Sequence, residues 1–207
     1  MIKHYYLCFN DEWKLDSDDV DFLLAESEKI DKSAGLAEEL SHDDDGEARD
    51  NIRNSTVGWL FSEKANDILL PYFEKANELC GWRYDASEME PLQVSEYHVD
   101  QYYDWHIDGG LDHFSKELLS GTDLDGLVRK LSLIVQLSDS DDYEGGDLFF
   151  SKPAAGGGLD IYGETLPQFR QKGAVIVFPS YVRHKVTPVT KGIKRSSTSL
   201  FCGPPLK

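Results

Sequence analysis

A short motif, His106-Ile107-Asp108, places two potential metal ligands at the end of a predicted strand. The residues before it, from Leu92 to Tyr103, are rich in the aromatic and β-branched types that favour strands. Residues two apart on a strand point to the same side, so the imidazole and the carboxylate can reach one ion. An HxD motif alone is a weak signal, because most such pairs lie at a surface or only form hydrogen bonds. A third ligand must come from elsewhere.

His184 is the best candidate for that third ligand. It follows the apolar run from Ala174 to Phe178, which predicts another strand. Two histidines and one carboxylate on one face of a metal leave three positions open, an arrangement that suits non-haem Fe(II) oxygenases binding a co-substrate and O₂. The remaining histidines have no comparable context, and we expect surface or structural roles for His4, His42, His98 and His113.

A basic residue near the metal would add an independent requirement of the same chemistry. When 2-oxoglutarate chelates iron through its keto acid end, its distal carboxylate must be neutralised by a buried Lys or Arg. Lys194 lies ten residues after His184 with Arg195 beside it, both at the start of a predicted strand. Neighbours on a strand face opposite ways, so only one of the two can point inward. The alternative is two solvated basic residues at a sheet edge.

The elements that must position these residues fall into two groups. Before residue 90 the pattern favours helices, one capped near Asp16 and one from about Ser62 to Leu79, in which Pro71 predicts a kink or break. After it, short strands alternate with turns, and residues 131–137 show the period of two that is typical of a half-buried strand. The acidic stretch 41–50 is expected to be an exposed loop.

This order of elements predicts an α+β fold with a double-stranded β-helix (jelly-roll) core backed by N-terminal helices. The chain of 207 residues is long enough for one domain. We therefore expect a single domain, 1–207, with mainly helical support in 1–90 and the jelly-roll catalytic core in 91–207.

Composition limits the partners of this chain. Its 38 Asp and Glu against 21 Lys and Arg give a formal net charge of −17, which disfavours nucleic-acid binding. Cys8, Cys80 and Cys202 lack disulfide-framework or zinc spacing, which favours a reducing compartment. With no signal-peptide pattern and no membrane-length apolar run, we expect a cytoplasmic protein with no membrane partner. The oligomeric state is left open.

At these residues the chain resembles the prolyl 4-hydroxylase-like group of Fe(II)/2-oxoglutarate oxygenases, which includes the PKHD-type hydroxylases. Four ordered blocks are far more specific than HxD alone. The matching segments are IRNSTVGWL (52–60), LQVSEYHVDQYYDWHID (92–108), LSLIVQLSDSDDYEGGDL (131–148) and KGAVIVFPSYVRHKVTPVTKGIK (172–194).

The resemblance implies His106, Asp108 and His184 as the iron ligands. It implies that Lys194 pairs with the distal carboxylate of 2-oxoglutarate, as in prolyl 4-hydroxylases, whereas PKHD-like members typically have Arg there and Arg195 remains the alternative. Tyr97 matches a tyrosine that helps to bind the co-substrate, and Tyr103 matches a second pocket aromatic. Either tyrosine could instead belong to the packed core.

The family also implies a reaction and a substrate class. Fe(II), 2-oxoglutarate and O₂ would hydroxylate a C–H bond while 2-oxoglutarate is decarboxylated to succinate, and a need for ascorbate is left open. Arg53 and Ser55 resemble an Arg-x-Ser element near the peptide groove of prolyl 4-hydroxylases, so peptidyl proline is the first candidate substrate. Asp108 favours hydroxylation, because related halogenases have a small residue at that position.

Two alternatives stay open at this point. The enzyme could hydroxylate a free amino acid or another small metabolite, which a closed pocket would favour over an open groove. A cupin-type jelly roll that binds a metal or a sugar without catalysis would need no basic residue deep in its barrel.

Overall fold

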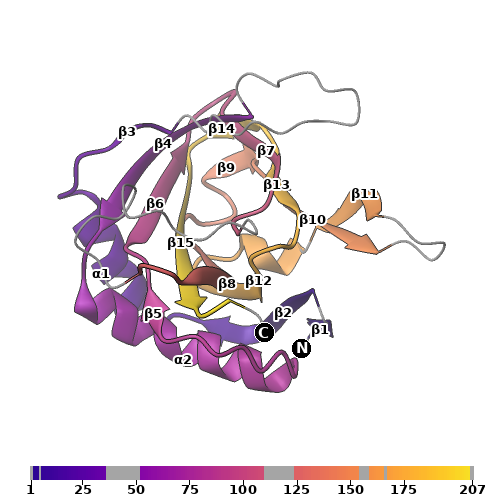
Figure 1. Ribbon diagram of the computed structural model, residues 1–207. Helices are drawn as coiled ribbons and strands as arrows, with labels where there is room; N and C mark the ends of the chain where they lie inside the picture. The colour runs from indigo at the N-terminus through magenta and orange to yellow at the C-terminus, as the bar shows by residue number, and fades with distance from the viewer. Residues whose placement is uncertain are drawn as a thin grey trace.

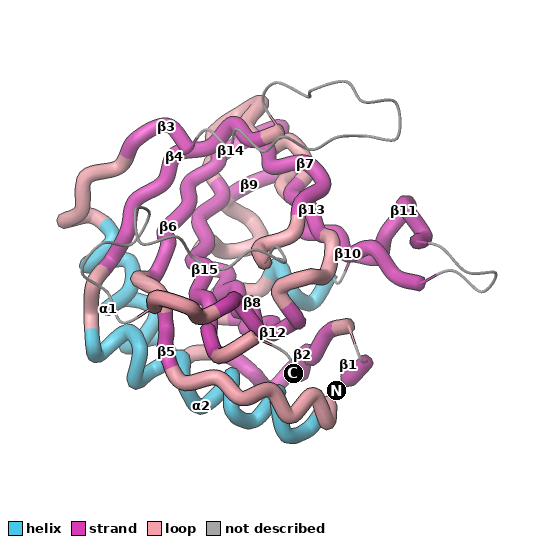
Figure 2. The backbone as a smooth tube through the Cα atoms, viewed as in Figure 1, coloured by secondary structure: helices cyan, strands magenta, loops and turns pink. Residues whose placement is uncertain are grey.

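The protein forms one curled antiparallel sheet with two helices on its outer face (Figures 1 and 2). The computed structural model describes residues 2–4, 6–35, 52–109, 124–153, 159–165 and 167–205. The acidic stretch 41–50, His42 and His113 lie outside these ranges. None of the described helices is both long and apolar enough to cross a membrane.

Within the described residues, thirteen strands share the main sheet and two more form a small ladder. The main sheet has the order β1-β2-β12-β8-β15-β6-β4-β7-β13-β10-β11, with β3 beside β4 and β5 beside β15; β9 pairs with β14. The strands are β1 (Ile2–His4), β2 (Leu7–Lys14), β3 (Ser33–Gly35), β4 (Arg53–Leu60), β5 (Glu88–Met89), β6 (Leu92–Tyr97), β7 (Tyr102–His106), β8 (Val128–Gln136), β9 (Tyr143–Gly145), β10 (Leu148–Pro153), β11 (Leu159–Thr165), β12 (Ala174–Pro179), β13 (His184–Val186), β14 (Val189–Gly192) and β15 (Lys194–Gly203).

The helices begin at the caps that the sequence predicts. Helix α1 (Ser17–Ser27) starts after Asp16, whose side chain accepts a hydrogen bond from the Asp19 backbone N–H, and α2 (Glu63–Leu79) starts after Ser62. A 3₁₀ turn, η1 (Pro167–Arg170), precedes β12. The predicted break at Pro71 is wrong, because α2 continues through it to Leu79. Packing of the helix against the sheet offsets the loss of one backbone hydrogen bond.

The structure has two separate hydrophobic cores, one between the helices and the sheet and one inside the curled sheet. Leu133 of β8 and Val175 of β12 pack with Leu69 and Phe73 of α2 in the outer core. Ile134 and its neighbours on the opposite face of the sheet belong to the inner core. The prediction that 131–137 is half-buried is therefore wrong: both faces of β8 are covered, one by helices and the other by the curled sheet.

The first ninety residues contribute more to the sheet than expected. β2 pairs with β12, and β4 pairs with both β6 and β7, so the segment predicted to give mainly helical support also supplies strands to the sheet. The buried positions of β4 largely alternate, as expected for a strand with Thr56, Val57 and Trp59. The predicted jelly-roll core backed by helices is confirmed, while the single-domain boundary stays a prediction.

Candidate metal centre and its cavity

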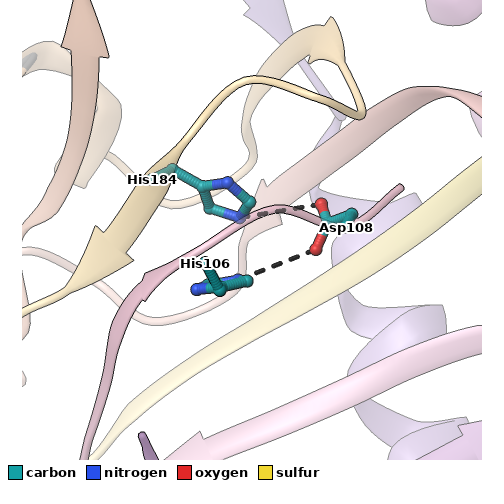
Figure 3. A group of neighbouring side chains, drawn as sticks. All are labelled: His106, Asp108 and His184. Carbon is teal, nitrogen blue, oxygen red and sulfur yellow. Dashed lines mark ion pairs between the residues drawn. The ribbon is translucent and has the colours of Figure 1, made fainter. Parts of the chain in front are cut away.

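The three predicted ligands converge from two neighbouring strands (Figure 3). His106 ends β7 and pairs directly with His184, which begins β13. Asp108 follows β7, with one carboxylate oxygen 3.7 Å from His106 Nε2 and the other 3.6 Å from His184 Nε2. One ligand atom from each residue lies within 4.8 Å of the others. Two imidazoles and a carboxylate thus face a common point.

Backbone carbonyls fix the orientation of both imidazole rings. His106 Nδ1 lies 2.7 Å from the Asp104 carbonyl oxygen, and His184 Nδ1 lies 3.0 Å from that of Val182. A carbonyl can only accept, so each Nδ1 carries the proton and donates it. Each Nε2 lone pair is then free toward the common point, the usual arrangement of metal-binding histidines.

The buried groups of the cluster suit a divalent cation. Burial, the neighbouring His184 and Arg53 lower the pKa of His106 to about 3, so its imidazole is neutral at physiological pH. Burial alone would raise the pKa of Asp108, but His184, His106, Ser132 and Arg129 hold it below its usual value. Asp108 Oδ2 is buried and accepts no hydrogen bond from the part of the chain that the structure describes. Two imidazole nitrogens and an unsatisfied carboxylate oxygen fit Fe(II).

A β-bulge brings Tyr103 beside the cluster. Between β13 and β7, His184 pairs with His106 but Val186 pairs with Tyr103, so β7 has one residue more than its partner. The extra residue places Tyr103 and His106 on the same side, with their rings stacked at 3.4 Å between centroids. The guanidinium of Arg53 lies over the Tyr103 ring at 4.6 Å. Tyr103 therefore supports the His106 ring from within the cavity wall.

Lys194 and Arg195 have opposite environments. Lys194 is 2% exposed and lines a cavity of about 160 Å³ that also contains His106 and His184. The Arg195 side chain is 41% exposed, and its Nε lies 3.2 Å from the carboxylate of Glu96. The sheet pairing decides which residue points inward, and it directs Lys194 into the cavity.

The Lys194 ammonium is a buried cation without a counter-ion among the described residues. Burial lowers the pKa of Lys194 from 10.5 to about 7, Arg170 adds to this, and Asp147 opposes it. Tyr97, directly opposite Lys194 in the β15–β6 register, is buried and lines the same cavity. A buried, unpaired ammonium is costly to the folded protein, which is the state expected of a group that awaits an anionic ligand.

Arg53 and Ser55 form one unit in the cavity wall. Both are buried, and Arg53 Nε donates to Ser55 Oγ at 2.8 Å. Longer contacts join the two terminal nitrogens of Arg53 to Gln93 Oε1 at 3.4 Å and Ser95 Oγ at 3.3 Å. Arg53 lines the cavity, whereas Ser55 serves mainly to orient it.

Three further cavity residues were not found from the sequence. Trp59 of β4 is 50% exposed and lines the cavity, and the alternation in 53–60 was a signal that could have revealed it. Glu90 and Arg129 also line the cavity and are paired with each other. They are 39 residues apart, and no local pattern connects them.

The fold and the side-chain cluster define a jelly-roll protein with a candidate two-histidine, one-carboxylate metal centre. Residues 92–202 match the model of the 2OG-Fe(II) oxygenase superfamily. This match covers more than half of the chain and includes all three cluster residues. The chain belongs to the 2OG-Fe(II) oxygenase superfamily, and membership implies Fe(II) with 2-oxoglutarate and O₂ as co-substrates.

Similar sequences come from bacterial PKHD-type hydroxylases. The chain is 27% identical to one from Idiomarina loihiensis over 145 residues, covering 70% of this chain and 56% of that protein. It is 36% identical to one from Herminiimonas arsenicoxydans over 109 residues, covering 51% of this chain and 40% of the relative. The chain thus spans about half the length of the curated relatives it matches.

Similar solved structures include prolyl hydroxylases. The viral collagen prolyl hydroxylase of Paramecium Bursaria Chlorella virus-1 superposes with a TM-score of 0.61 at 19% identity, covering 97% of both chains. A Pseudomonas putida prolyl-4-hydroxylase gives 0.61 at 18% identity, covering 95% of this chain and 92% of that chain. At these identities the likeness shows the fold.

Proposed function

We propose that this protein is an Fe(II)/2-oxoglutarate-dependent dioxygenase that hydroxylates a C–H bond, with His106, Asp108 and His184 as the iron ligands. One observation carries the proposal: a triad with two buried histidines shares its cavity with the Lys194 ammonium, which has no ion-pair partner in the described part of the chain. A metal-binding jelly roll without catalysis has no need for that ammonium, so the cupin-type alternative is not favoured.

The residues of the chain bind and orient the reactants. When bound, Fe(II) and 2-oxoglutarate supply an oxidant from O₂, releasing succinate and CO₂. Lys194 binds the distal carboxylate by a charge-assisted hydrogen bond, and the Tyr97 hydroxyl assists on the facing strand. Gly146 leaves room for this lysine, because a Cβ there would lie 3.1 Å from Lys194 Cδ. The Arg195 alternative is not favoured, since its side chain is paired outside the cavity.

Peptidyl proline is our first candidate for the substrate. Several solved structures of similar fold are named prolyl hydroxylases, and one from Trichoplax adhaerens, with a TM-score of 0.59 at 15% identity, is in complex with a hypoxia inducible factor peptide fragment. The half-exposed indole of Trp59 gives the cavity an aromatic surface for a proline ring, and Arg53 can donate to a peptide carbonyl. The cytoplasmic location and the absence of nucleic-acid partners stay predictions, and a need for ascorbate stays open.

Mass spectrometry of proline-containing peptides tests the substrate class. After incubation with Fe(II), 2-oxoglutarate and O₂, we expect a gain of one oxygen on a prolyl residue and an equal amount of succinate. Free proline and other free amino acids serve as parallel substrates. Oxygen gain on a free amino acid but on none of the peptides would contradict the peptidyl assignment and favour the metabolite hydroxylase.

Binding of 2-oxoglutarate should be coupled to proton uptake at Lys194. At pH 8 this lysine, with a pKa of about 7, is mostly neutral in the free protein. The bound carboxylate favours the ammonium form, so binding should take up as much as one proton and weaken as the pH rises from 7 to 9. Anaerobic calorimetry in buffers of different ionisation enthalpy measures this uptake. Binding without proton uptake at pH 8, or tightening with pH, would contradict the role of Lys194.

A further inference from the structure

We infer that the ion pair between Arg129 and Glu90 is a positioning device for Asp108 and thereby sets the affinity of the metal centre. The inference rests on the proposed function, since it concerns the carboxylate ligand of that centre. Neither residue contacts the common point of the cluster, and their action is on the backbone that carries Asp108.

Asp108 lies beyond the last ladder hydrogen bonds of its strand. β7 ends at His106, so the sheet does not hold the peptide unit of Asp108. The backbone N–H groups of Asp108 and Gly109 both donate to the Ser180 carbonyl, at 3.0 and 2.9 Å. A side chain at 109 would not fit, because a Cβ there would lie 2.9 Å from Ser180 Cβ and 3.2 Å from the Arg129 carbonyl oxygen. The Ser180 carbonyl therefore holds the peptide units on both sides of Asp108.

Arg129 adds a second contact to the peptide unit that follows Asp108. Its Nη1 donates to the Asp108 carbonyl at 2.6 Å. Its Nε and Nη2 donate to the two carboxylate oxygens of Glu90, at 2.6 and 2.8 Å. All three bonds come from one rigid planar guanidinium, so it cannot turn away from Asp108 without breaking its pair with Glu90.

The elements around this ion pair are themselves well anchored. Arg129 lies on β8, and the backbone N–H of Ser180 donates to the carbonyl of the neighbouring Lys130 at 3.0 Å. The same strand therefore holds Ser180 through its backbone and Asp108 through a side chain. Glu90 is 7% exposed and lies between β5 and β6. The contact through Ser180 and the contact through Arg129 both connect Asp108 to the central strands of the sheet.

A fixed peptide unit matters because the carboxylate must meet two imidazoles that are already held in place. If the Arg129 contact is lost, only the Ser180 carbonyl holds the peptide units around Asp108, so the carboxylate can rotate further. Restoring its orientation then costs part of the free energy of metal binding. Changes to groups that orient metal ligands typically weaken binding about ten- to a hundredfold. A purely structural ion pair would instead lower stability and leave metal affinity unchanged.

Anaerobic titration with Co(II), followed by its visible absorption, measures this effect without catalysis. We expect Arg129→Met to raise the Co(II) dissociation constant about ten- to a hundredfold. Arg129→Lys, which keeps one donor, should restore part of the affinity, and Glu90→Gln should have an intermediate effect. Because Glu90 acts through Arg129, the Glu90→Gln effect should disappear in the Arg129→Met background.

Arg170→Met is the matched control. Arg170 also combines an ion pair, to Asp147 at 2.6 Å, with bonds to backbone carbonyls, but it does not contact Asp108. The Arg170→Met variant should have a lower melting temperature. Its Co(II) dissociation constant should change by less than about twofold, because changes at independent sites do not affect one another. Folded Arg129→Met and Glu90→Gln proteins that bind Co(II) like the wild type would overturn the inference. So would an equal loss of affinity in Arg170→Met.

The same titration separates this inference from the proposed function. His106→Ala should abolish Co(II) binding at the site. If the wild type binds no Co(II), or if His106→Ala binds it equally well, the metal centre itself is wrong and the inference falls with it. If His106→Ala fails to bind while Arg129→Met is unaffected, the metal centre stands and only the positioning role is lost.

Discussion

Replacing His184 by alanine should abolish succinate formation and reduce metal binding below detection. Only His106 and Asp108 would then remain, and two ligands do not define the face of a metal that leaves three positions for co-substrate and O₂. The Nδ1 hydrogen bond to the Val182 carbonyl directs Nε2 of His184 toward the site, and the alanine variant loses this ligand atom. Succinate release and bound iron, measured on the purified variant, check the expectation.

His98→Ala is the control for this loss. The His98 side chain is 48% exposed and lies near Glu96, outside the cluster. Its removal should leave both turnover and bound iron unchanged. Normal turnover in His184→Ala, with the iron content of the wild type, would contradict the ligand assignment.

Replacing Lys194 by alanine should weaken 2-oxoglutarate binding by far more than replacing Arg195. Truncating one partner of a buried charge pair costs about 2–5 kcal/mol, which corresponds to roughly thirtyfold to several thousandfold in affinity. Arg195 is partly exposed and paired with Glu96, so Arg195→Ala should change the affinity by about twofold or less. Anaerobic binding of 2-oxoglutarate to the metal-loaded proteins measures both. The reverse ranking would identify Arg195 as the anion ligand.

Lys194→Met separates binding from stability. The lysine is buried and has no ion-pair partner among the residues that the structure describes, so an apolar side chain of similar length should raise the melting temperature while 2-oxoglutarate binding is lost. Because the pKa of Lys194 is depressed to about 7, the unfolded chain binds the additional proton between pH 7 and 10.5. The gain from Lys194→Met should therefore be largest below pH 7 and shrink as the pH rises. Destabilisation at pH 6 would indicate that Lys194 is not an unpaired buried cation.

Much of the fold follows from local sequence patterns, but these patterns do not show whether each face of a strand is buried. The helix caps at Asp16 and Ser62 and the strand periodicity of 131–137 are local, and the structure confirms these elements. Burial of both faces of β8 depends on helices and strands distant in the sequence, so a period of two was mistaken for one exposed face. The strands before residue 90 were missed because their partners, such as β12 for β2, lie far along the chain.

In the candidate site too, some features follow from local sequence patterns and others depend on distant parts of the chain. The HxD spacing and the position of His184 predicted the cluster, although Asp108 lies two residues beyond the end of β7 and is not placed there by strand geometry. The choice between Lys194 and Arg195 needs the register of β15, which faces Lys194 with Tyr97. The bulge that stacks Tyr103 on His106 leaves no recognisable pattern in the sequence.

Anaerobic titration of the Fe(II)-loaded protein with 2-oxoglutarate tests the central claim most directly. Chelation of iron by the keto acid produces a weak visible charge-transfer band, which requires the three-residue centre and the anion site together. We predict a band that saturates at about one 2-oxoglutarate per protein, is absent in His184→Ala and needs far more 2-oxoglutarate in Lys194→Ala. A folded protein that retains its iron but shows no band at saturating 2-oxoglutarate would contradict the account.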